Sequence, residues 1–528
     1  MLKTSYGFSG CVTAPHRLAT KAGVDILEAG GTAVEAMVAA AATIAVVYPH
    51  MNSIGGDGFW IIKKKGQAPI SIEACGQAAR LATVAAYAKQ GYSDQIPTRG
   101  GPAALTVPGT IGGWKKALEY DSSPSPLPLA DLLANASKYA RNGIAVTKNQ
   151  FECTRDKLQG LSDVPGFANV YLDKGNAPST GSCLKQTALA NTFEHLSRFG
   201  LDAYYNGDIA YAHDDFWRNN DSPLRAEDLT DYKCVQTRPL EITTSLGTFY
   251  NTNPPTQGVS SLMILGIFDR LNAENPDGFD HVHGLVEATK QAFTIRNREL
   301  GDALSMNKKA SELLASALLD ELASDIDPAI ASPWPYEQKK GDTIWMGACD
   351  KEGTMVSFIQ SVFWEFGSGL TCPETGVFFQ NRGAGFSLAK GPNQLAPGRK
   401  PFHTLNPAFA ELADGRLMAY GTMGGEGQPQ TQAALLTRYA AFGVDLQDAI
   451  TAPRWLLGKT WGENTSSLKV ENNIEPELVD ALIEAGHDVE YVSALNDIMG
   501  HAGAIVLHKN NLIAGANDPR SDGLALAF

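Results

Sequence analysis

Apolar positions in the first 50 residues predict two consecutive helices. Between Leu18 and Ala29 they recur every three or four residues and form one apolar face. Gly30-Gly31 ends this helix. Thr32 and Glu35 then provide a capping box for a second helix, which is apolar on nearly every face. We therefore expect this second helix to be buried.

The hydrophobic pattern divides the rest of the chain into a helical middle and a strand-rich end. Helical spacing recurs between residues 120 and 340, at 129–143, 184–200 and 279–300. From residue 343 onward the pattern predicts strands, with hairpins at 343–362 and 502–518 and strand-like segments at 376–381 and 409–422. No Pro- or Ser-rich linker separates the two regions, so we expect them to share one core.

Composition and charge exclude several classes of protein. The chain has 528 residues, with 43 Lys and Arg against 57 Asp and Glu, which gives a net charge of −14. An apolar content of 44% is typical of globular proteins, and the acidic excess disfavours nucleic acid or an anionic membrane as a partner. The start of the chain lacks the apolar core of a signal peptide, and the longest apolar stretch is shorter than the roughly 20 residues that span a bilayer. We therefore expect a cytoplasmic protein.

Cysteine, histidine and glycine motifs give no sign of a cofactor. Seven cysteines, scattered and without C-x-x-C, fit neither a disulfide framework nor a zinc site. His281 and His283 would face apart on a helix, with no third ligand near them in the sequence, so no metal site is predicted. The glycine-rich segment 55–58 leads from helix to strand, the reverse of a dinucleotide-binding turn, and is interpreted as a tight turn.

Thr343 is the first residue of the predicted strand 343–350, directly after the charged stretch 336–342. A threonine at a chain terminus combines a nucleophilic hydroxyl with its own α-amine as base. An internal threonine gains this chemistry only when the chain is cut before it. On the residues alone, Thr343 is therefore interpreted as an ordinary threonine at the start of a strand.

Nine segments in a fixed order change this interpretation. They are 12–63, 107–114, 224–232, 254–258, 342–369, NPAF at 406–409, GTMGGEG at 421–427, APRW at 452–455 and NDPRSDG at 517–523. In this order the chain resembles the γ-glutamyltranspeptidase family of N-terminal-nucleophile hydrolases over nearly its whole length.

The resemblance implies a fold and a processing event. The fold is an α+β, four-layer αββα sandwich. The precursor cleaves itself between Asp342 and Thr343, and the large subunit 1–342 and small subunit 343–528 remain together as a heterodimer. Whether that heterodimer dimerises further is left open. No cofactor is implied.

Catalytic roles carry over position by position. Thr343 matches the family's nucleophile, which first attacks the Asp342 carbonyl and then uses its freed amine as base. Gly424 and Gly425 match the glycine pair whose backbone N–H groups form the oxyanion hole. Ser361 stands where the family usually has a threonine that assists the nucleophile; otherwise Ser361 is an ordinary strand residue.

At four places the sequence departs from the family pattern in residues that bind a γ-glutamyl substrate. Ile72 or a near neighbour replaces the arginine that binds the α-carboxylate, and Gly385 replaces the aspartate that binds the α-amine. His403-Thr404 replaces a serine pair, and Phe363 replaces an asparagine. Losing a carboxylate that pairs with an ammonium costs several kcal/mol of binding, so glutathione is not the expected substrate.

Cationic residues at Arg382 and His403, with Thr404 beside them, suit a small anionic amide whose carboxylate lies close to the scissile bond. Arg399 and Lys400 are interpreted as surface charges. The resemblance further implies oxamate as the substrate, cleaved to oxalate and ammonia at the end of a ureide-type nitrogen-scavenging route. The alternatives are a glutaryl or cephalosporin side-chain amide, a γ-glutamyl compound, and an unprocessed, non-catalytic relative of the family.

Overall fold

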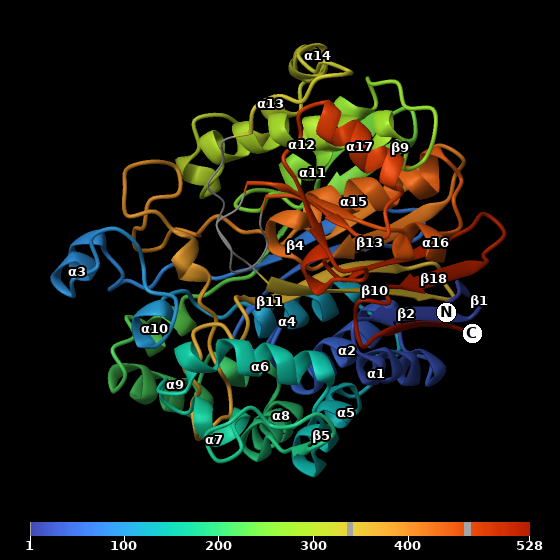
Figure 1. The fold of residues 1–528 in the computed structure, drawn as a ribbon. Helices are drawn as coiled ribbons and strands as arrows, with labels where there is room; N and C mark the ends of the chain where they lie inside the picture. Colours follow the sequence, from blue (N-terminus) through green and yellow to red (C-terminus); the bar gives the residue numbers. More distant parts are fainter. Residues whose placement is uncertain (1, 335–341, 459–465) are drawn as a thin grey trace.

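Two seven-stranded antiparallel sheets lie face to face in the computed structural model, which describes residues 2–334, 342–458 and 466–528 (Figure 1). The first sheet has the order β19 (Leu524–Ala527), β2 (Gly10–Ala14), β10 (Asp342–Asp350), β11 (Met355–Phe363), β3 (Asp57–Lys63), β4 (Ile70–Ala74) and β7 (Val235–Thr237). The second has the order β1 (Ser5–Gly7), β18 (Ile513–Asn517), β17 (Ala502–Leu507), β13 (Leu417–Thr422), β12 (Ala408–Leu412), β9 (Gly247–Asn251) and β8 (Leu240–Thr244).

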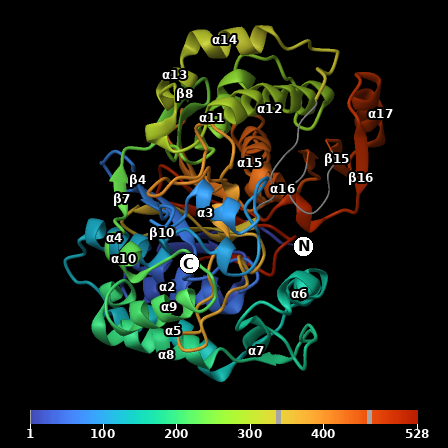
Figure 2. The ribbon, with the colours of Figure 1, turned by 90° about the vertical axis from the view of Figure 1, so that its left-hand side faces the viewer.

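Helices cover the outer face of each sheet, so the molecule has four layers (Figure 2). Beside the first sheet lie α1 (Arg17–Glu28), α2 (Ala33–Val47), α4 (Thr110–Asp121), α5 (Leu129–Asn142), α6 (Lys148–Leu161), α7 (Phe167–Tyr171), α8 (Thr187–Phe199), α9 (Asp208–Arg218) and α10 (Ala226–Thr230). Beside the second lie α11 (Gly258–Phe268), α12 (Phe279–Glu299), α13 (Ala310–Leu313), α14 (Ser316–Ser324), α15 (Gln428–Leu436), α16 (Leu446–Thr451) and α17 (Pro476–Glu484). This arrangement confirms the predicted αββα sandwich.

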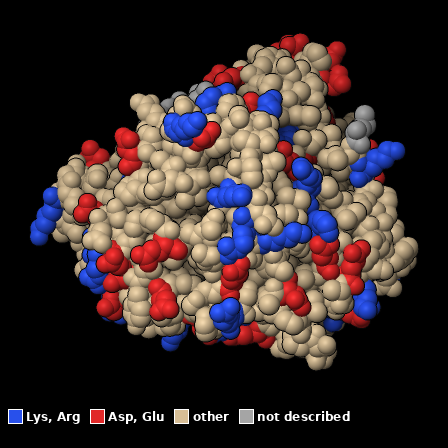
Figure 3. All heavy atoms as spheres, turned by 90° about the horizontal axis from the view of Figure 1, so that it is seen from below, with Lys and Arg blue, Asp and Glu red and all other residues tan. Residues whose placement is uncertain are grey.

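Smaller elements complete the fold. A three-stranded sheet contains β14 (Trp455–Leu457), β15 (Leu468–Glu471) and β16 (Val489–Val492), and a two-stranded one contains β5 (Ile144–Ala145) and β6 (Cys183–Leu184). The short helix α3 (Val84–Lys89) projects to one side (Figure 1). None of the described helices combines the length and apolar composition that a bilayer crossing requires. Acidic and basic side chains intermingle on the face shown in Figure 3.

The predicted helix pair is confirmed with its capping box. The Thr32 side chain accepts a hydrogen bond from the Glu35 N–H, and the Glu35 carboxylate accepts one from the Thr32 N–H. Every residue of α2 is buried, because this helix lies between the first sheet and α1 and α5. The helices predicted at 129–143, 184–200 and 279–300 correspond to α5, α8 and α12, and the hairpin predicted at 343–362 corresponds to β10 and β11.

The strand expected at 376–381 is wrong. This segment makes only isolated bridges, from Phe378 to Thr371 and from Phe379 to Gly55. The reason is that its backbone groups bond to different segments instead of pairing along one neighbouring strand: the Gln380 N–H donates to the Gly55 carbonyl in the loop before β3, and the Asn381 N–H to the Val362 carbonyl in β11.

Side-chain alternation in the first sheet decides which residues face the second sheet. Trp345, Ile359 and Phe59 lie between the sheets, whereas their neighbours along β10, β11 and β3 face the helices. Thr343, Ser361 and Asp57 lie two residues away on the same strands and therefore share the inner face. The fold thus brings one end of three adjacent strands to a single place between the sheets.

Gly56 permits the close approach of the loop before β3 to β11. A Cβ atom at this position would overlap the Ser361 carbonyl oxygen. Gly56→Ala is therefore expected to lower the free energy of unfolding by about 1–3 kcal/mol, measured by chemical denaturation. Gly160→Ala is the matched control: it lies exposed in α6, an added Cβ meets only the Arg99 side chain at 4.0 Å, and helix propensity predicts a gain of about 0.5–1 kcal/mol. Equal effects of the two substitutions would contradict the close packing at Gly56.

Candidate active site

Thr343 lies at an irregularity in the pairing of β10 with β11. Asp342 is opposite Phe363 and Ile344 is opposite Gln360, so Thr343 faces both Ser361 and Val362. Such bulges re-aim side chains at the ends of strands. The Thr343 Oγ1 hydroxyl donates to Ser361 Oγ at 3.3 Å, and Ser361 Oγ also accepts the Phe363 N–H at 2.9 Å. The fold therefore brings the predicted nucleophile and its predicted assistant into contact.

The predicted cleavage site is described on one side only. Residues 335–341, which include most of the charged stretch before Thr343, lie outside the described part of the chain, as does the side chain of Asp342. The backbone of Asp342 is the first residue of β10. The structure therefore leaves the cleavage between Asp342 and Thr343 as a prediction.

Phe363 has a left-handed backbone conformation, with φ of 82°. A non-glycine residue in this region costs on the order of 1–3 kcal/mol and persists only where its surroundings demand it. The Phe363 ring lies against the guanidinium of Arg382, with 3.7 Å between the guanidinium carbon and the ring centroid. The strained residue thus forms one aromatic wall beside the predicted substrate-binding arginine.

Arg382 is fully buried, and its guanidinium is only partly satisfied. Nη2 donates to Thr404 Oγ1 at 3.1 Å, whereas Nε and Nη1 have no hydrogen-bond partner among the described residues. Burial lowers the pKa of Arg382 to about 9, against the opposing effect of the Asp57 carboxylate. Buried donors without an acceptor are costly, so this guanidinium is suited to receive the carboxylate of a ligand.

His403 is held by two partners of the protein itself. Its Nδ1 accepts the Leu405 N–H at 3.4 Å, which leaves the proton on Nε2 to be donated to Asp57 Oδ2 at 3.1 Å. Burial and the charges of Arg382 and Lys400 hold the pKa of His403 well below its usual value. The imidazole is therefore neutral and positions Asp57; the structure does not show a ring nitrogen left over for substrate.

Asp57 is a buried residue of the site that the sequence interpretation missed. The turn expected at 55–58 is present, but Asp57 itself begins β3 and is buried beside Ser361. Its Oδ1 accepts the Gln380 side-chain amide at 3.0 Å and the N–H groups of Gly76 and Gly109 at 3.3 and 3.2 Å. Burial raises its pKa to about 7. The only sign of this residue in the sequence is a charged side chain at the first position of a mainly apolar strand.

Gly424 and Gly425 have φ values of 110° and 50°, in the region that favours glycine. Among the described residues neither N–H group has a hydrogen-bond acceptor. One side-chain amide positions this segment: Gln257 Nε2 donates at 2.8 Å to the carbonyl oxygens of both Gly425 and Thr404. Gln257 Oε1 in turn accepts from Arg296 Nη1 at 2.9 Å. The glycine pair and the hydroxyl partner of Arg382 are therefore held by a single group.

Ile72, the position matched to the family's carboxylate-binding arginine, does not face the site. Ile72 faces the helical layer, so it cannot contact a substrate between the sheets. Its neighbour Glu73 lies opposite Phe59, on the inner face, and forms an ion pair with Lys400. Lys400, interpreted from the sequence as a surface charge, is thus a partly buried neighbour of the site. Gly385 leaves the position of the family's amine-binding carboxylate without a side chain.

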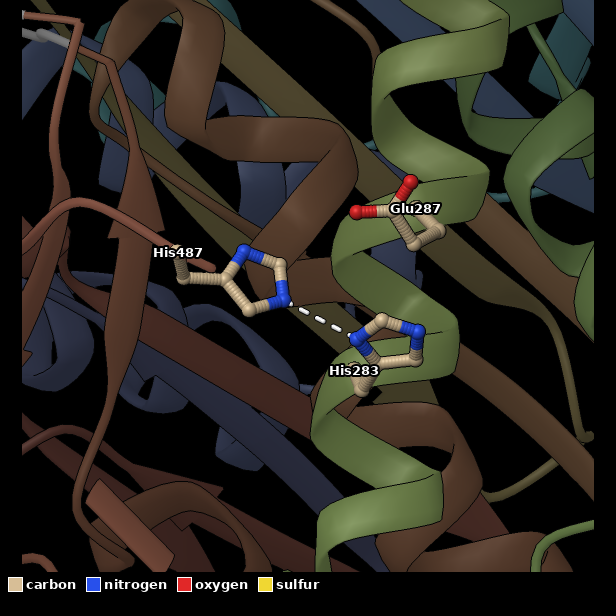
Figure 4. Close-up of side chains that lie close together, drawn as sticks. All are labelled: His283, Glu287 and His487. Atoms are coloured by element: carbon tan, nitrogen blue, oxygen red, sulfur yellow. Dashed lines mark hydrogen bonds between the residues drawn. The ribbon is translucent and has the colours of Figure 1, made fainter. Parts of the chain in front are cut away.

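A second polar cluster could supply metal ligands. His283 and Glu287 project from α12 toward His487, which precedes β16 (Figure 4). His283 Nδ1 lies 2.9 Å from His487 Nε2, and His283 Nε2 lies 2.8 Å from the Asp327 carbonyl oxygen. Glu287 pairs with Lys290 at 2.7 Å. Because every one of these groups already has a protein partner, the contacts account for the cluster without an ion.

The two facing sheets, the helical outer layers and a threonine at the head of a central strand define the N-terminal-nucleophile hydrolase class of fold. The chain belongs to the Gamma-glutamyltranspeptidase family, whose pattern matches residues 19–528. This family membership confirms the resemblance on which the site residues were chosen.

Relatives of known sequence and structure match the whole chain. It is 50% identical over 524 residues to the oxamate amidohydrolase proenzyme of Klebsiella pneumoniae, with 98% of each chain covered. It is 36% identical to the glutathione hydrolase-like YwrD proenzyme of Bacillus subtilis, with both chains covered completely. The crystal structure of cephalosporin acylase from Bacillus halodurans superposes with a TM-score of 0.92 at 29% identity, covering 100% of this chain and 97% of that one.

Gln257 provides a test of how the glycine pair is held. Gln257→Leu is expected to lower the free energy of unfolding by about 2–4 kcal/mol, because two buried carbonyls and the Arg296 guanidinium lose a partner. Chemical denaturation measures the change. Gln67→Leu, at an exposed turn, is the control and should stay within about 0.5 kcal/mol of the parent. A Gln257→Leu protein as stable as the control would show that Gln257 does not hold Gly425.

Proposed function

We propose that the protein is a self-processing amidohydrolase that hydrolyses oxamate to oxalate and ammonia. The observation that carries the proposal is the buried Arg382, whose Nε and Nη1 have no partner among the described residues and lie beside Phe363, close to the Thr343–Ser361 pair. The 50% identity to a protein named oxamate amidohydrolase proenzyme supports this choice of amide. Oxamate places a carboxylate directly next to the scissile amide, which suits a cation beside Phe363, two residues along β11 from Ser361.

Processing comes first. The Thr343 hydroxyl attacks the Asp342 carbonyl carbon, and the peptide nitrogen leaves as the α-amine of Thr343. Water then hydrolyses the resulting ester, which gives a new carboxylate at Asp342 and restores the Thr343 hydroxyl. The two pieces, 1–342 and 343–528, remain associated as a heterodimer because strands of both form each sheet.

Turnover uses the same hydroxyl. The Thr343 α-amine accepts the hydroxyl proton while Oγ1 attacks the amide carbon of oxamate. Backbone N–H groups of Gly424 and Gly425 stabilise the oxyanion that forms, and the protonated amine returns its proton to the leaving ammonia. Water then releases oxalate from the ester. Ser361 orients the Thr343 hydroxyl in both reactions.

Arg382 and Thr404 bind the substrate carboxylate in this scheme. Thr404 Oγ1 holds one guanidinium nitrogen, so the others are directed toward the ligand. His403 contributes indirectly, because both of its ring nitrogens are engaged by the protein. Phe363 limits the length of the acyl group, which disfavours the longer side chain of a cephalosporin despite the similar fold of the B. halodurans acylase.

Thr343→Ala is expected to give a folded, uncleaved chain without activity, because one hydroxyl serves both processing and turnover. Thr343→Ser keeps a hydroxyl and an amine and should cleave with partial activity. A denaturing gel of the purified proteins measures processing. Two fragments in the alanine variant would exclude Thr343 as the processing nucleophile, and a single full-length band in the parent protein would favour the unprocessed, non-catalytic relative.

Arg382→Ala is expected to raise KM for oxamate and lower kcat/KM by a factor that corresponds to about 2–4 kcal/mol, the loss of a buried charge-assisted contact. Ammonia release by the cleaved protein measures the change. Arg218→Ala, on the exposed side of α9, is the control and should leave kcat/KM unchanged. Cleaved parent protein that releases no ammonia from oxamate, yet hydrolyses a glutaryl or γ-glutamyl anilide well, would refute the oxamate assignment.

A further inference from the structure

Asp57 is a buried carboxylate to which the proposed reaction gives no role. It lies on the inner face of the first sheet, directly opposite Ser361 in the pairing of β3 with β11. Four donors of the protein hold it: three reach Oδ1, and His403 reaches Oδ2. Asp57 is therefore held rigidly and contributes mainly its charge to the site.

The charges around Asp57 are balanced before a substrate enters. Arg382 carries one positive charge, Asp57 one negative charge, and His403 is neutral. Two further charged groups near the carboxylate, Glu73 and Lys400, form an ion pair and cancel each other. Burial raises the pKa of three other neighbours, so they stay uncharged: the Cys75 thiol and the Tyr205 and Tyr232 phenols. In the processed protein the Thr343 α-amine is one further titratable group.

A monoanionic ligand on Arg382 upsets this balance. The carboxylate would add one negative charge to a space in which Asp57 and Arg382 are fully desolvated. An uncompensated buried charge is among the most expensive features a protein can hold. The group that can remove the excess is Asp57, because a proton on its carboxylate leaves Arg382 paired with the ligand alone.

We propose that Asp57 takes up one proton from solvent when a carboxylate binds to Arg382, so that anionic substrates bind with proton uptake. The proposal deepens the proposed function, because it assumes that Arg382 is the carboxylate site. The proton bonds to Oδ2, which keeps a lone pair for the His403 Nε2–H, while Oδ1 stays the acceptor of its three donors. The imidazole therefore keeps its tautomer, with Nδ1 accepting the Leu405 N–H.

The direction of the pH dependence follows from linkage. Burial raises the pKa of free Asp57 to about 7, and a neighbouring anion raises it further. Well below pH 7, Asp57 is already protonated and affinity is independent of pH. Above pH 7, binding requires uptake of a proton, so affinity falls by up to tenfold per pH unit until the pKa of the bound state is passed.

Propionate is a suitable probe, because it has the size and single charge of oxamate and cannot be hydrolysed. Calorimetric titration of the processed wild-type protein at pH 8, in phosphate and in Tris buffer, counts the protons taken up from the difference in heat. We expect close to one proton per propionate and a dissociation constant that rises with pH above 7. Absence of uptake, or absence of binding, would overturn the proposal.

Asp57→Asn separates the carboxylate from the Thr343 amine. The variant should bind propionate with the same heat in both buffers, whereas Asp121→Asn, a buried aspartate at the end of α4, should keep the uptake. Uptake that persists in Asp57→Asn would assign it to the amine and refute the role of Asp57.

Infrared difference spectroscopy provides a readout that needs no variant. Binding of ¹³C-labelled propionate to the wild-type protein should produce the C=O band of a protonated protein carboxyl group, and its absence would again refute the proposal. Proton-linked propionate binding without oxamate hydrolysis would remove the proposed function while leaving this inference intact.

Discussion

The antiparallel pairing of β10 with β2 on one side and β11 on the other is the interaction on which the rest of the molecule depends. β10 lies in the middle of the first sheet, and its inner face packs against the second sheet through Trp345. The same strand places Thr343 opposite Ser361 at the edge of the sandwich. Backbone pairing along the strand therefore determines both the cohesion of the two layers and the position of the nucleophile, whereas Arg382, His403 and Thr404 come from the long connection between β11 and β12.

The selectivity proposed for the site rests on buried charge more than on shape. The γ-glutamyl grip of the family uses a carboxylate to hold an ammonium, and Gly385 removes that group here. A carboxylate is nevertheless present at Asp57, but four donors of the protein already surround it, so it cannot serve a substrate amine. Arg382, by contrast, keeps two donors without a partner among the described residues. In the proposed function, the site recognises a carboxylate instead of an amino acid because the protein itself satisfies Asp57 but not Arg382.

Sequence patterns predicted the parts of the fold that depend on local periodicity. The capping box at Thr32, the buried helix α2 and the β10–β11 hairpin each carry their signal within a few residues, and the family resemblance supplied the layers. Asp57 could not be recognised in this way, because its partners come from the loop after β4, the loop before α4, and two segments more than 300 residues later. The hydrogen bonds of His403 with Leu405 and Asp57 could not be predicted from the sequence either, since they depend on the tautomer that the fold selects.

Strands from both sides of the proposed cut alternate across the two sheets: β10 and β11 lie between β2 and β3, and β12 lies beside β9. Once the chain is cut, the intact sandwich still holds the pieces, but the peptide link that kept them at high effective concentration is gone. Refolding of a denatured enzyme then becomes an encounter between two separate chains, each of which lacks strands of both sheets. The precursor folds once for the lifetime of the enzyme, and the rate of unfolding, not the equilibrium between folded and unfolded states, decides how long each molecule works.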